Sequence, residues 1–406
     1  MNQHDPVVIV GGGLAGATAA FALRERGIDG RIVIVSEEPQ LPYERPPLSK
    51  TYLRGEEPLE KAFVKQASDY HAQSIELLGG RRAVQLDPIS RRVNLDDGTD
   101  LPYGALLLAT GSAPRRLDVE GGDLAGIHLL RTAPDADSLR AAAADAKAIV
   151  VVGSGWIGTE VAASLTQMGH AVTLVSDTDQ PLQRVLGTEI GKVYADLHTA
   201  HGVTIVNGKV SSLEGDERVT GVRLADGQVL IADLVVVGIG AVPRTKLALR
   251  GGLEIKQGGI AVDEYLRTSV PSIYAAGDIA AAWHPRFGRH IRVEHWDNAI
   301  QQALTAAANI AGANEPYTRT PYFYSDQFDL GMEYRGFAPE WGRVVVRGDV
   351  AKREFLAFWL ADGRVVAAMN ANLWDFGDEL TELVESERRI DPDRLTDPDV
   401  PLAEAA

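Results

Sequence analysis

Two glycine-rich turns stand out among the residues whose types and spacing could do chemistry. They are Gly11-x-Gly13-x-x-Gly16 and Gly153-x-Gly155-x-x-Gly158. Between a strand and a helix, the first glycine of this pattern permits a tight turn and the second lets a pyrophosphate approach the backbone. The third lets the helix pack closely on the strand. Free amide groups at the helix start then hold the phosphates, so the spacing predicts two dinucleotide-binding sites.

The residues that follow each turn–helix unit bear on the ribose. Glu37 comes directly after a second apolar strand and is placed to bind ribose hydroxyls of the first dinucleotide. In the second unit Ser176 stands where an acid is most usual, with Asp177 one step later and no basic residue before Arg184. Asp177 and Asp179 would repel a 2′-phosphate. The pattern therefore favours NADH over NADPH.

The composition excludes several classes of function. The chain has 406 residues, which predicts two or three domains, and no cysteine. Without cysteine there are no disulfides, no thiolate metal sites, no cysteine-held iron–sulfur clusters and no thiol redox chemistry. Electrons handled by this chain must therefore sit on a bound cofactor. The net charge of −16 argues against a nucleic-acid partner, and the histidines show no metal-ligand spacing.

No part of the sequence predicts a membrane segment. The longest apolar runs are only of strand length, whereas a crossing needs about 20 apolar residues. The N-terminal residues 1–6 are polar and carry no basic or apolar export segment. We therefore expect no membrane partner and a cytoplasmic location.

The elements that must position these residues form two βαβ units. Apolar runs before and after each turn predict strands, and the small-residue runs between them predict helices. A later stretch rich in aromatic residues predicts an antiparallel sheet and one helix, followed by a loosely held Asp- and Pro-rich tail from residue 391. The strands expected are 7–10, 32–35, 92–95, 148–152, 171–175, 234–237, 343–347, 354–360 and 365–369, with one more in the run 272–278, which leads into Asp278 at a turn. The helices expected are 14–26, 159–168 and 378–387.

Further motifs lie between and after the two glycine-rich turns, which are called the first and second fingerprints below. They are Pro42-Tyr43-Glu44-Arg45-Pro46-Pro47-Leu48-Ser49-Lys50, Ala109-Thr110-Gly111, Leu130-Arg131-Thr132, Glu160, Gly277-Asp278, Glu294-His295-Trp296 and Pro321–Gln327. With them the chain resembles the NADH-dependent ferredoxin reductases of bacterial oxygenase systems. This group includes the putidaredoxin and rhodocoxin reductases and belongs to the glutathione-reductase-like flavoproteins. The resemblance covers almost the whole chain, and the proline loop ending at Lys50 is its most specific motif.

The resemblance implies an α/β fold with two Rossmann-like domains, which bind FAD and NAD(P), and a C-terminal α+β domain. The FAD domain would comprise residues 1–112 and 244–316, the NAD domain 113–243 and the C-terminal domain 317–406. It implies that hydride passes from NADH to FAD and that single electrons then pass to a [2Fe–2S] ferredoxin. In disulfide reductases of this fold a cysteine pair occupies an early helix. This chain has none, so electrons would leave the flavin for an external acceptor.

Lys50 and Glu160 are the candidate catalytic residues. Three prolines stiffen the loop that carries Lys50 and fix its direction. The resemblance implies that Lys50 lies beside the flavin, pairs with Glu160 and stabilises the reduced, anionic ring. The alternative is a solvated surface lysine on a Pro-rich connection.

The resemblance also implies a set of cofactor contacts. For Asp278 an N-cap of a following helix is the alternative to a ribityl contact, and for Trp296 a core position is the alternative to a flavin contact. His295 is interpreted as a local hydrogen-bonding residue, not a proton donor. Besides the fingerprint glycines, Glu37, Lys50, Glu160 and the ribose-site residues named above, the implied contacts are Ala15, Arg45, Ala83, Ala109, Thr110, Gly111, Arg131, Asp278, Glu294, His295 and Trp296 for FAD, and Ile157 and Gly238 for NAD.

A basic cluster precedes Glu294 and is a hypothetical landing surface for an acidic ferredoxin; a solvated loop is the ordinary alternative. Its members are Arg286, Arg289, His290 and Arg292. Other acceptors remain open, namely rubredoxin, a quinone or a small oxidant such as monodehydroascorbate. A further alternative of another class is a nucleotide-sensing interaction protein like the apoptosis-inducing flavoprotein, against which the acidic balance counts.

Overall fold

The structure is a computed structural model and describes residues 5–405. Most of the polar N-terminus considered above therefore lies outside the described residues. By its internal contacts the chain forms two compact units, which are described separately below. The first unit comprises residues 1–45, 58–113 and 241–319, and the second comprises 46–57, 114–240 and 320–406.

A parallel five-stranded sheet forms the centre of the first unit. Its β1 strand is four consecutive apolar residues, all at most 5% exposed, because the strand lies in the centre of the sheet and within the main apolar cluster of the unit. The strands expected at 7–10 and 32–35 are confirmed. In sheet order the strands are β20 (Ile273–Ala275), β7 (Ala105–Leu108), β1 (Val7–Val10), β2 (Ile32–Ser36) and β3 (Ile75–Gly79).

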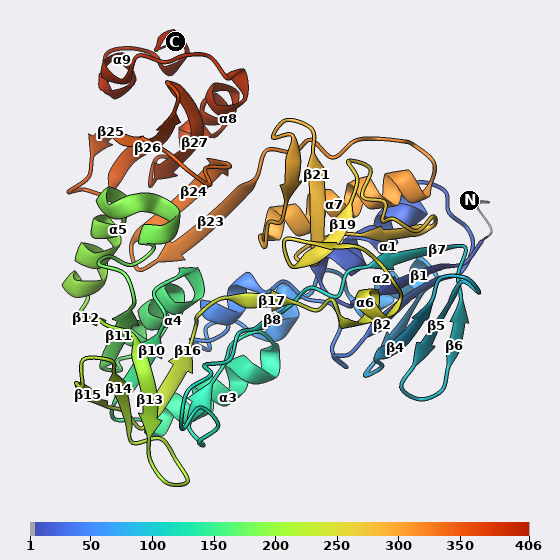
Figure 1. Cartoon of the computed structure of the whole chain (residues 1–406), viewed down its shortest axis with the longest axis horizontal. Coiled ribbons are helices and arrows are strands. Elements are labelled where there is room, and N and C mark those ends of the chain that lie inside the picture. The colour runs from blue at the N-terminus through green and yellow to red at the C-terminus, as the bar shows by residue number, and fades with distance from the viewer. Residues whose placement is uncertain (1–4, 406) are drawn as a thin grey trace. The chain divides into compact units, whose positions relative to one another are not determined.

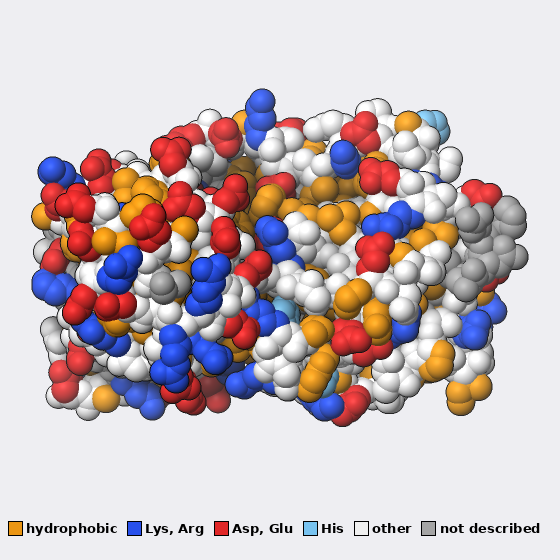
Figure 2. All heavy atoms as spheres, turned by 90° about the horizontal axis from the view of Figure 1, so that it is seen from above, with side chains coloured by type: hydrophobic (Ala, Val, Ile, Leu, Met, Phe, Trp, Pro, Cys, Tyr) orange, Lys and Arg blue, Asp and Glu red, His pale blue; other side chains and the backbone are white. Residues whose placement is uncertain are grey.

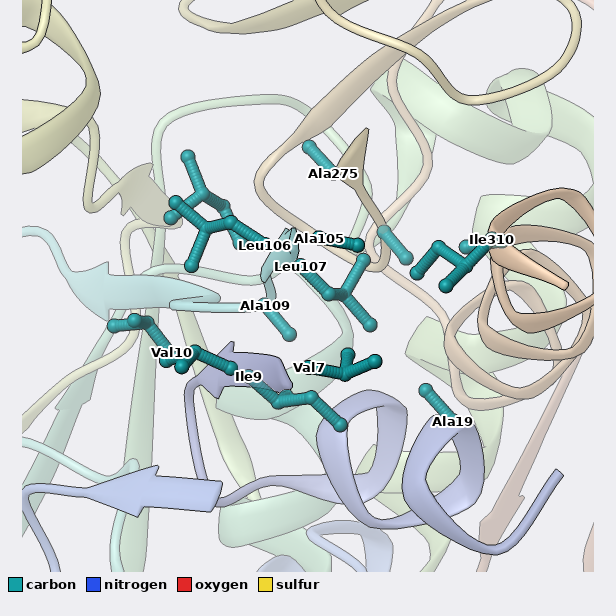
Figure 3. Close-up of a cluster of buried hydrophobic side chains, with 14 of the residues drawn as sticks. Val7, Ile9, Val10, Ala19, Ala105, Leu106, Leu107, Ala109, Ala275 and Ile310 are labelled. Atoms are coloured by element: carbon teal, nitrogen blue, oxygen red, sulfur yellow. The ribbon is translucent and has the colours of Figure 1, made fainter. Parts of the chain in front are cut away.

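Two alanine-rich helices pack together against this sheet, α1 (Leu14–Glu25) and α7 (Trp296–Ile310). Figure 3 shows side chains of β1, β7 and β20 together with Ala19 of α1 and Ile310 of α7 in one apolar cluster. Small side chains let the two helix backbones approach closely. This packing holds the start of α1 directly after β1, where the phosphate site is expected.

Shorter elements complete the first unit (Figure 1). The antiparallel sheet β4–β5–β6 lies against α6, and a mixed sheet is formed by β18, β19, β21 and β22. The bounds are β4 (Ala83–Asp87), β5 (Arg92–Leu95), β6 (Asp100–Pro102), β17 (Ala241–Pro243), β18 (Ile255–Lys256), β19 (Gly259–Val262), β21 (Ala280–His284), β22 (Arg289–Ile291), η2 (Leu59–Ala62), α2 (Ala67–Ala72) and α6 (Lys246–Arg250); β8 (Ser112–Pro114) runs from this unit into the second.

The second unit repeats the strand–turn–helix arrangement. A parallel sheet in the order β12-β11-β10-β16-β9 carries α4 (Trp156–Gln167) directly after β10. The helix begins three residues earlier than its sequence suggests, because Gly155 already caps it. The other bounds are η1 (Pro46–Ser49), β9 (Ile127–His128), α3 (Ala133–Asp145), β10 (Ile149–Val152), β11 (Val172–Ser176), α5 (Gln183–Ala200), β12 (Thr204–Asn207), β13 (Val210–Glu214), β14 (Gly221–Leu224), β15 (Val229–Ile231) and β16 (Leu234–Val237).

The C-terminal part of the second unit is the expected antiparallel sheet, in the order β23-β24-β27-β26-β25. One face packs against apolar residues of α5, and the other packs against α8. The sheet is therefore buried on both sides. The bounds are β23 (Tyr322–Gln327), β24 (Leu330–Gly336), β25 (Arg343–Asp349), β26 (Glu354–Ala361), β27 (Arg364–Ala371), η3 (Trp374–Phe376) and α8 (Gly377–Ser386).

The prediction of a loosely held tail is wrong. After residue 391 the chain forms α9 (Pro392–Thr396) and η4 (Leu402–Glu404). Leu395 and Leu402 are at most 2% exposed in the same apolar cluster as α8. Arg347 of β25 also donates to two backbone carbonyls of the tail. Leu395 and Leu402 stand among Asp and Pro residues and seven positions apart, so the sequence pattern did not suggest a packed segment.

The domain boundaries expected from the sequence stay a prediction. By contacts, residues 46–57 belong with the NAD-type fingerprint, and the residues from 320 onward group with the same unit. The proline loop therefore divides at Arg45, whose side chain lies in the first unit, while Lys50 lies in the second.

Candidate active site

The first fingerprint has one glycine that neither packing nor backbone geometry requires. A Cβ on Gly11 would lie 2.0 Å from the carbonyl oxygen of Ala109, and one on Gly16 would lie 2.0 Å from that of Gly11. Gly13 caps α1 with extended backbone (φ −95°, ψ −170°), and a Cβ there meets no atom within 4 Å. The open space at Gly13 therefore fits a ligand phosphate that approaches the helix amides.

The second fingerprint repeats this arrangement. A Cβ on Gly158 would lie 1.8 Å from the carbonyl oxygen of Gly153, and one on Gly153 would lie 2.5 Å from that of Gly238. Gly155 caps α4 with φ −78° and ψ −175°, and its Cβ position is open. A Cβ on Gly238 would in turn lie 3.1 Å from the backbone of Gly158. Two equivalent phosphate cradles thus lie at the starts of α1 and α4.

The acid of the first ribose site is held by a residue that sequence reasoning missed. Arg244 donates to Glu37 Oε2 at 2.6 Å, and its backbone carbonyl accepts from Thr110 Oγ1 at 3.2 Å. The next residue, Glu38, accepts from Arg45 at 2.9 Å and from the Tyr43 hydroxyl. Burial acts to lower the pKa of Arg45, but Glu38 and Tyr43 outweigh it and raise the pKa. The consecutive acids Glu37 and Glu38 were the available indication of this cluster.

At the second ribose position Ser176 is not available to a ligand. Its side chain is buried and hydrogen-bonds to Ser154 Oγ at 2.8 Å and to the carbonyl of Thr178 at 2.7 Å. Asp177 is half-exposed and accepts two hydrogen bonds from Arg184, at 2.7 and 2.9 Å, which lower the pKa of Asp177. Of these two candidates only Asp177 is placed at the surface.

Lys50 and Glu160 form a buried ion pair within the second unit. Lys50 Nζ lies 2.7 Å from Glu160 Oε2, and the side chains are 13% and 6% exposed. The pair arises because η1 ends at Ser49 and Glu160 lies in the first turns of α4, four residues after Trp156. The structure therefore joins the two residues proposed as catalytic. A solvated surface position for Lys50, the alternative considered above, is wrong.

Other polar residues around this pair were not among the sequence candidates. Ser49 donates to Glu160 Oε2 at 2.5 Å, and Ser325 donates to Glu160 Oε1 at 2.7 Å. The ring centroid of Tyr324 lies 6.0 Å from Lys50 Nζ. Burial raises the pKa of Asp326, with Lys50 opposing the shift and Glu160 adding to it. The polar run Ser-Asp-Gln inside an aromatic strand was the available indication.

Asp278 lies in the turn between β20 and β21, so no helix follows it. The N-cap alternative is therefore wrong, and the ribityl contact stays a prediction. His295 caps α7, and burial lowers its pKa to about 4 although Asp278 acts against the shift. His295 is thus neutral at pH 7, which agrees with a local hydrogen-bonding role. Trp296, the first residue of α7, is half-buried.

The basic cluster is only partly available as a surface. Arg292 is 20% exposed and its guanidinium is bound to Glu294 and to the backbone carbonyls of Gln257 and Asp278. Ser112 also donates to Glu294, at 3.0 Å. Arg292 is thus held by these partners, whereas Arg289 is exposed on β22, and the landing surface stays a prediction. On the face in Figure 2, Lys and Arg side chains lie among Asp and Glu.

The remaining candidates fall in both units. Arg131 lies in the second unit, where its backbone N–H donates to Asp135 at the start of α3. Ile157, the residue after Trp156 in α4, is 45% exposed. Those in the first unit are Ala15, which is 7% exposed in α1, Ala83 at the start of β4, and Ala109, Thr110 and Gly111 after β7.

Across residues 5–405, no group of three or more His, Cys, Asp or Glu is arranged to hold a metal ion. None of the helices in the described part of the chain combines the length and apolar character that a bilayer crossing needs.

Two open glycine positions at helix starts on parallel sheets and a buried Lys–Glu pair fit an oxidoreductase that binds two dinucleotides. Comparison with known families agrees. Residues 5–303 match the pyridine nucleotide-disulphide oxidoreductase family, and residues 322–406 match a reductase C-terminal family. The chain belongs to the pyridine nucleotide-disulphide oxidoreductase family. This confirms the predicted fold class, and FAD and NAD(P)H, the predicted cofactors, are those of the family.

Relatives extend over the whole chain. A 5,5′-dehydrodivanillate O-demethylase ferredoxin reductase subunit from Sphingobium sp. is 42% identical, covering 99% of this chain and 98% of the relative. Putidaredoxin reductase from Pseudomonas putida is 36% identical, covering 100% and 97%. The crystal structure of a ferredoxin reductase from Rhodopseudomonas palustris aligns with a TM-score of 0.95 at 36% identity, covering 99% and 100%. That of a covalent putidaredoxin reductase–putidaredoxin complex aligns with a TM-score of 0.94, also at 36% identity, covering 100% and 98%.

Proposed function

We propose that this protein is an FAD-containing NADH:ferredoxin reductase that supplies electrons to an oxygenase. The observation that carries the proposal is the pair of open glycine positions, Gly13 and Gly155, at the starts of two helices. Each fits one pyrophosphate, so the chain has a place for a flavin dinucleotide and a place for a nicotinamide dinucleotide. Relatives named as ferredoxin reductases of oxygenase systems support the choice of acceptor.

The overall reaction balances as NADH plus two oxidised ferredoxins giving NAD⁺, H⁺ and two reduced ferredoxins. FAD, when bound, supplies the conversion of one two-electron donation into two single-electron transfers. The protein's own residues bind and orient the reactants. Gly13 and the amides of α1 hold one pyrophosphate and Glu37 its ribose. Gly155 and the amides of α4 hold the other.

We propose that Lys50 and Glu160 position the nicotinamide against the flavin. Lys50 presents a cation whose charge is balanced at 2.7 Å by a carboxylate in a dry site. Such a preorganised pair costs no reorganisation during the reaction. No residue is needed as a general acid or base, because hydride transfer moves no proton between side chains. The chain contains no cysteine, so the electrons leave without a thiol relay.

The test is anaerobic stopped-flow reduction of the bound flavin by NADH, followed by turnover with a [2Fe–2S] ferredoxin. Wild-type protein is expected to be reduced by NADH and to reduce ferredoxin faster than rubredoxin, a quinone or monodehydroascorbate. Glu160→Ala is expected to slow flavin reduction at least tenfold while leaving FAD content unchanged. An unchanged reduction rate would remove the proposed role of Glu160. Faster turnover with another acceptor would mean that ferredoxin is not the electron acceptor and would identify that compound or protein in its place.

Docking and location complete the proposal. Arg289 and Arg286 are the cations of the basic cluster that we propose as a ferredoxin contact, since the charge of Arg292 is balanced by Glu294. Charge reversal at Arg289 is expected to raise the KM for ferredoxin and weaken its salt dependence without changing flavin reduction by NADH. We propose a cytoplasmic location, where NADH is produced.

A further inference from the structure

Glu160 is the end of a buried polar chain that the proposed reaction does not by itself explain. Behind it lie Ser325 and Gln327 of β23, each 1% exposed, and His198 of α5, which is fully buried. Apolar residues of α5 and the C-terminal sheet surround them. Buried polar groups are costly unless each donor and acceptor has a partner, so the direction of every hydrogen bond here is constrained.

The hydroxyl groups fix the orientation of the Gln327 amide. Ser325 gives its single hydroxyl proton to Glu160 Oε1, because a carboxylate can only accept. Thr159 gives its proton to backbone carbonyls of the preceding turn, at 3.0 and 3.1 Å. Both oxygens therefore need a donor from Gln327, which lies 3.0 Å from Thr159 and 3.2 Å from Ser325. The amide nitrogen must face the hydroxyls, and the amide oxygen must face away.

This orientation in turn fixes the tautomer of His198. Its Nε2 lies 2.8 Å from Gln327 Oε1, which can only accept, so Nε2 carries the proton. Nδ1 is then an acceptor, and it is buried with no hydrogen-bond partner in the described structure. Burial lowers the pKa of His198 to about 4, so the ring is neutral at pH 7. All three hydrogen bonds therefore point the same way, from His198 through Gln327 and Ser325 to Glu160.

We propose that Ser325, Gln327 and His198 are positioning residues that hold the Glu160 carboxylate in one orientation for the nicotinamide. The inference rests on the proposed function and deepens it. Glu160 Oε2 is shared by Lys50 and Ser49, whereas Oε1 is held by Ser325. Without Ser325 the carboxylate can rotate about its terminal torsion, which is broad for glutamate. Aligned hydrogen bonds also polarise one another, so each link strengthens the next.

The first experiment compares Ser325→Ala with Ser325→Thr by anaerobic stopped-flow reduction with NADH. Ser325→Ala is expected to lower the limiting rate about tenfold, which corresponds to about 1.4 kcal/mol, with FAD content unchanged. Ser325→Thr keeps the hydroxyl and is expected to restore the rate to within twofold. A Ser325→Ala rate within twofold of wild type would overturn the inference.

Asn370→Ala is the matched control. Asn370 is a fully buried polar residue of the same sheet, on β27, and its partners are Arg335 and Glu333. It is expected to lower thermal stability without slowing flavin reduction. If Asn370→Ala slows reduction as much as Ser325→Ala, the effect is a general loosening of the sheet and the positioning role is refuted.

A double variant separates positioning from other effects. In a Glu160→Ala background, Ser325→Ala is expected to change the limiting rate by less than twofold, because its target is gone. A further tenfold loss would mean that Ser325 acts elsewhere. If NADH does not reduce the wild-type flavin at all, the proposed function fails instead, so the two failures are distinguishable.

The direction of the hydrogen bonds from His198 to Glu160 has its own test that does not depend on activity. Nitrogen NMR of ¹⁵N-histidine-labelled holoprotein, with His198→Gln used for assignment, reports the tautomer. The expected result is a proton on Nε2 that persists between pH 6 and 8. A proton on Nδ1 would mean that the hydrogen bonds do not run from His198 to Glu160, and it would overturn the inference.

Discussion

Alanine at Gly13 is expected to remove FAD without harming the fold. The position has extended backbone that any residue adopts, and its Cβ direction is open. In the apoprotein, glycine to alanine at such a position stabilises by about 0.4–1 kcal/mol, because the unfolded chain loses freedom. The stability of the holoprotein is expected to fall, since the new methyl group occupies the space into which the pyrophosphate would bind.

The size of the binding loss follows from the contacts at the helix start. A phosphate displaced by a methyl group loses charge-assisted hydrogen bonds to backbone amides, each worth roughly 1.5–3 kcal/mol. Losing two of them weakens FAD binding by about 3–6 kcal/mol, which is more than a hundredfold in Kd. Gly155→Ala is expected to do the same to NADH while leaving FAD in place.

The assay combines flavin absorbance of the purified variant, calorimetric titration of the apoprotein with FAD, and thermal unfolding of the apo forms. Gly16→Ala is the control, because its Cβ would lie 2.0 Å from the carbonyl oxygen of Gly11 and so disrupts the fold itself. Gly13→Ala should give a folded apoprotein, and Gly16→Ala should not. Normal FAD affinity in Gly13→Ala would refute the assignment of this turn as a phosphate site.

Three further predictions use other parts of the structure. Asp177→Asn releases Arg184 from its ion pair and removes a carboxylate that repels a 2′-phosphate, so kcat/KM for NADPH should rise about tenfold, and an additional Arg184→Ala should cancel the gain. His198 has a pKa of about 4 when folded and 6.5 when unfolded, so the unfolded state binds a proton more readily between these values. The contribution of His198 to the free energy of unfolding should be complete above pH 6.5 and fall by about 2–3 kcal/mol towards pH 4. His198→Gln should remove this part of the pH dependence of thermal unfolding. Leu395→Ala should cost about 2–4 kcal/mol in unfolding experiments, whereas a free tail would show no change.

The fingerprints and the strands that precede them could be predicted because they are local. Four consecutive apolar residues before a glycine turn need no knowledge of the rest of the chain, and β1 and β10 were found at their expected bounds within a residue. The residues at the second ribose position were harder to predict. Ser176 is turned inward by hydrogen bonds to Ser154 and Thr178, which lie 22 and 2 residues away and whose geometry no local pattern reveals.

The tail and the basic cluster also show that local sequence does not reveal which distant residues a side chain will contact. Composition predicted a loose end after residue 391, yet Leu395 and Leu402 each fill a place in an apolar cluster formed by distant elements. Arg292 was expected in a charged surface, and the structure adds that it is bonded to Glu294 and two backbone carbonyls. Whether a charged or apolar side chain faces inward depends on partners supplied by the fold.

If Glu160 positions the nicotinamide as proposed, its contacts make the C-terminal sheet part of that site, although both nucleotide fingerprints lie outside the sheet. Glu160 comes from α4, its partners Ser49 and Lys50 come from η1 or the residue directly after it, and Ser325 comes from β23, which is 165 residues further along the chain than Glu160. A carboxylate on α4 with donors from two other segments keeps its orientation only if both of those segments are in place. A chain ending before β23 would retain both phosphate cradles, yet it would lack the hydroxyl that fixes Oε1. On the proposed role of Glu160, nucleotide binding and productive alignment of the nicotinamide are therefore expected to be separable.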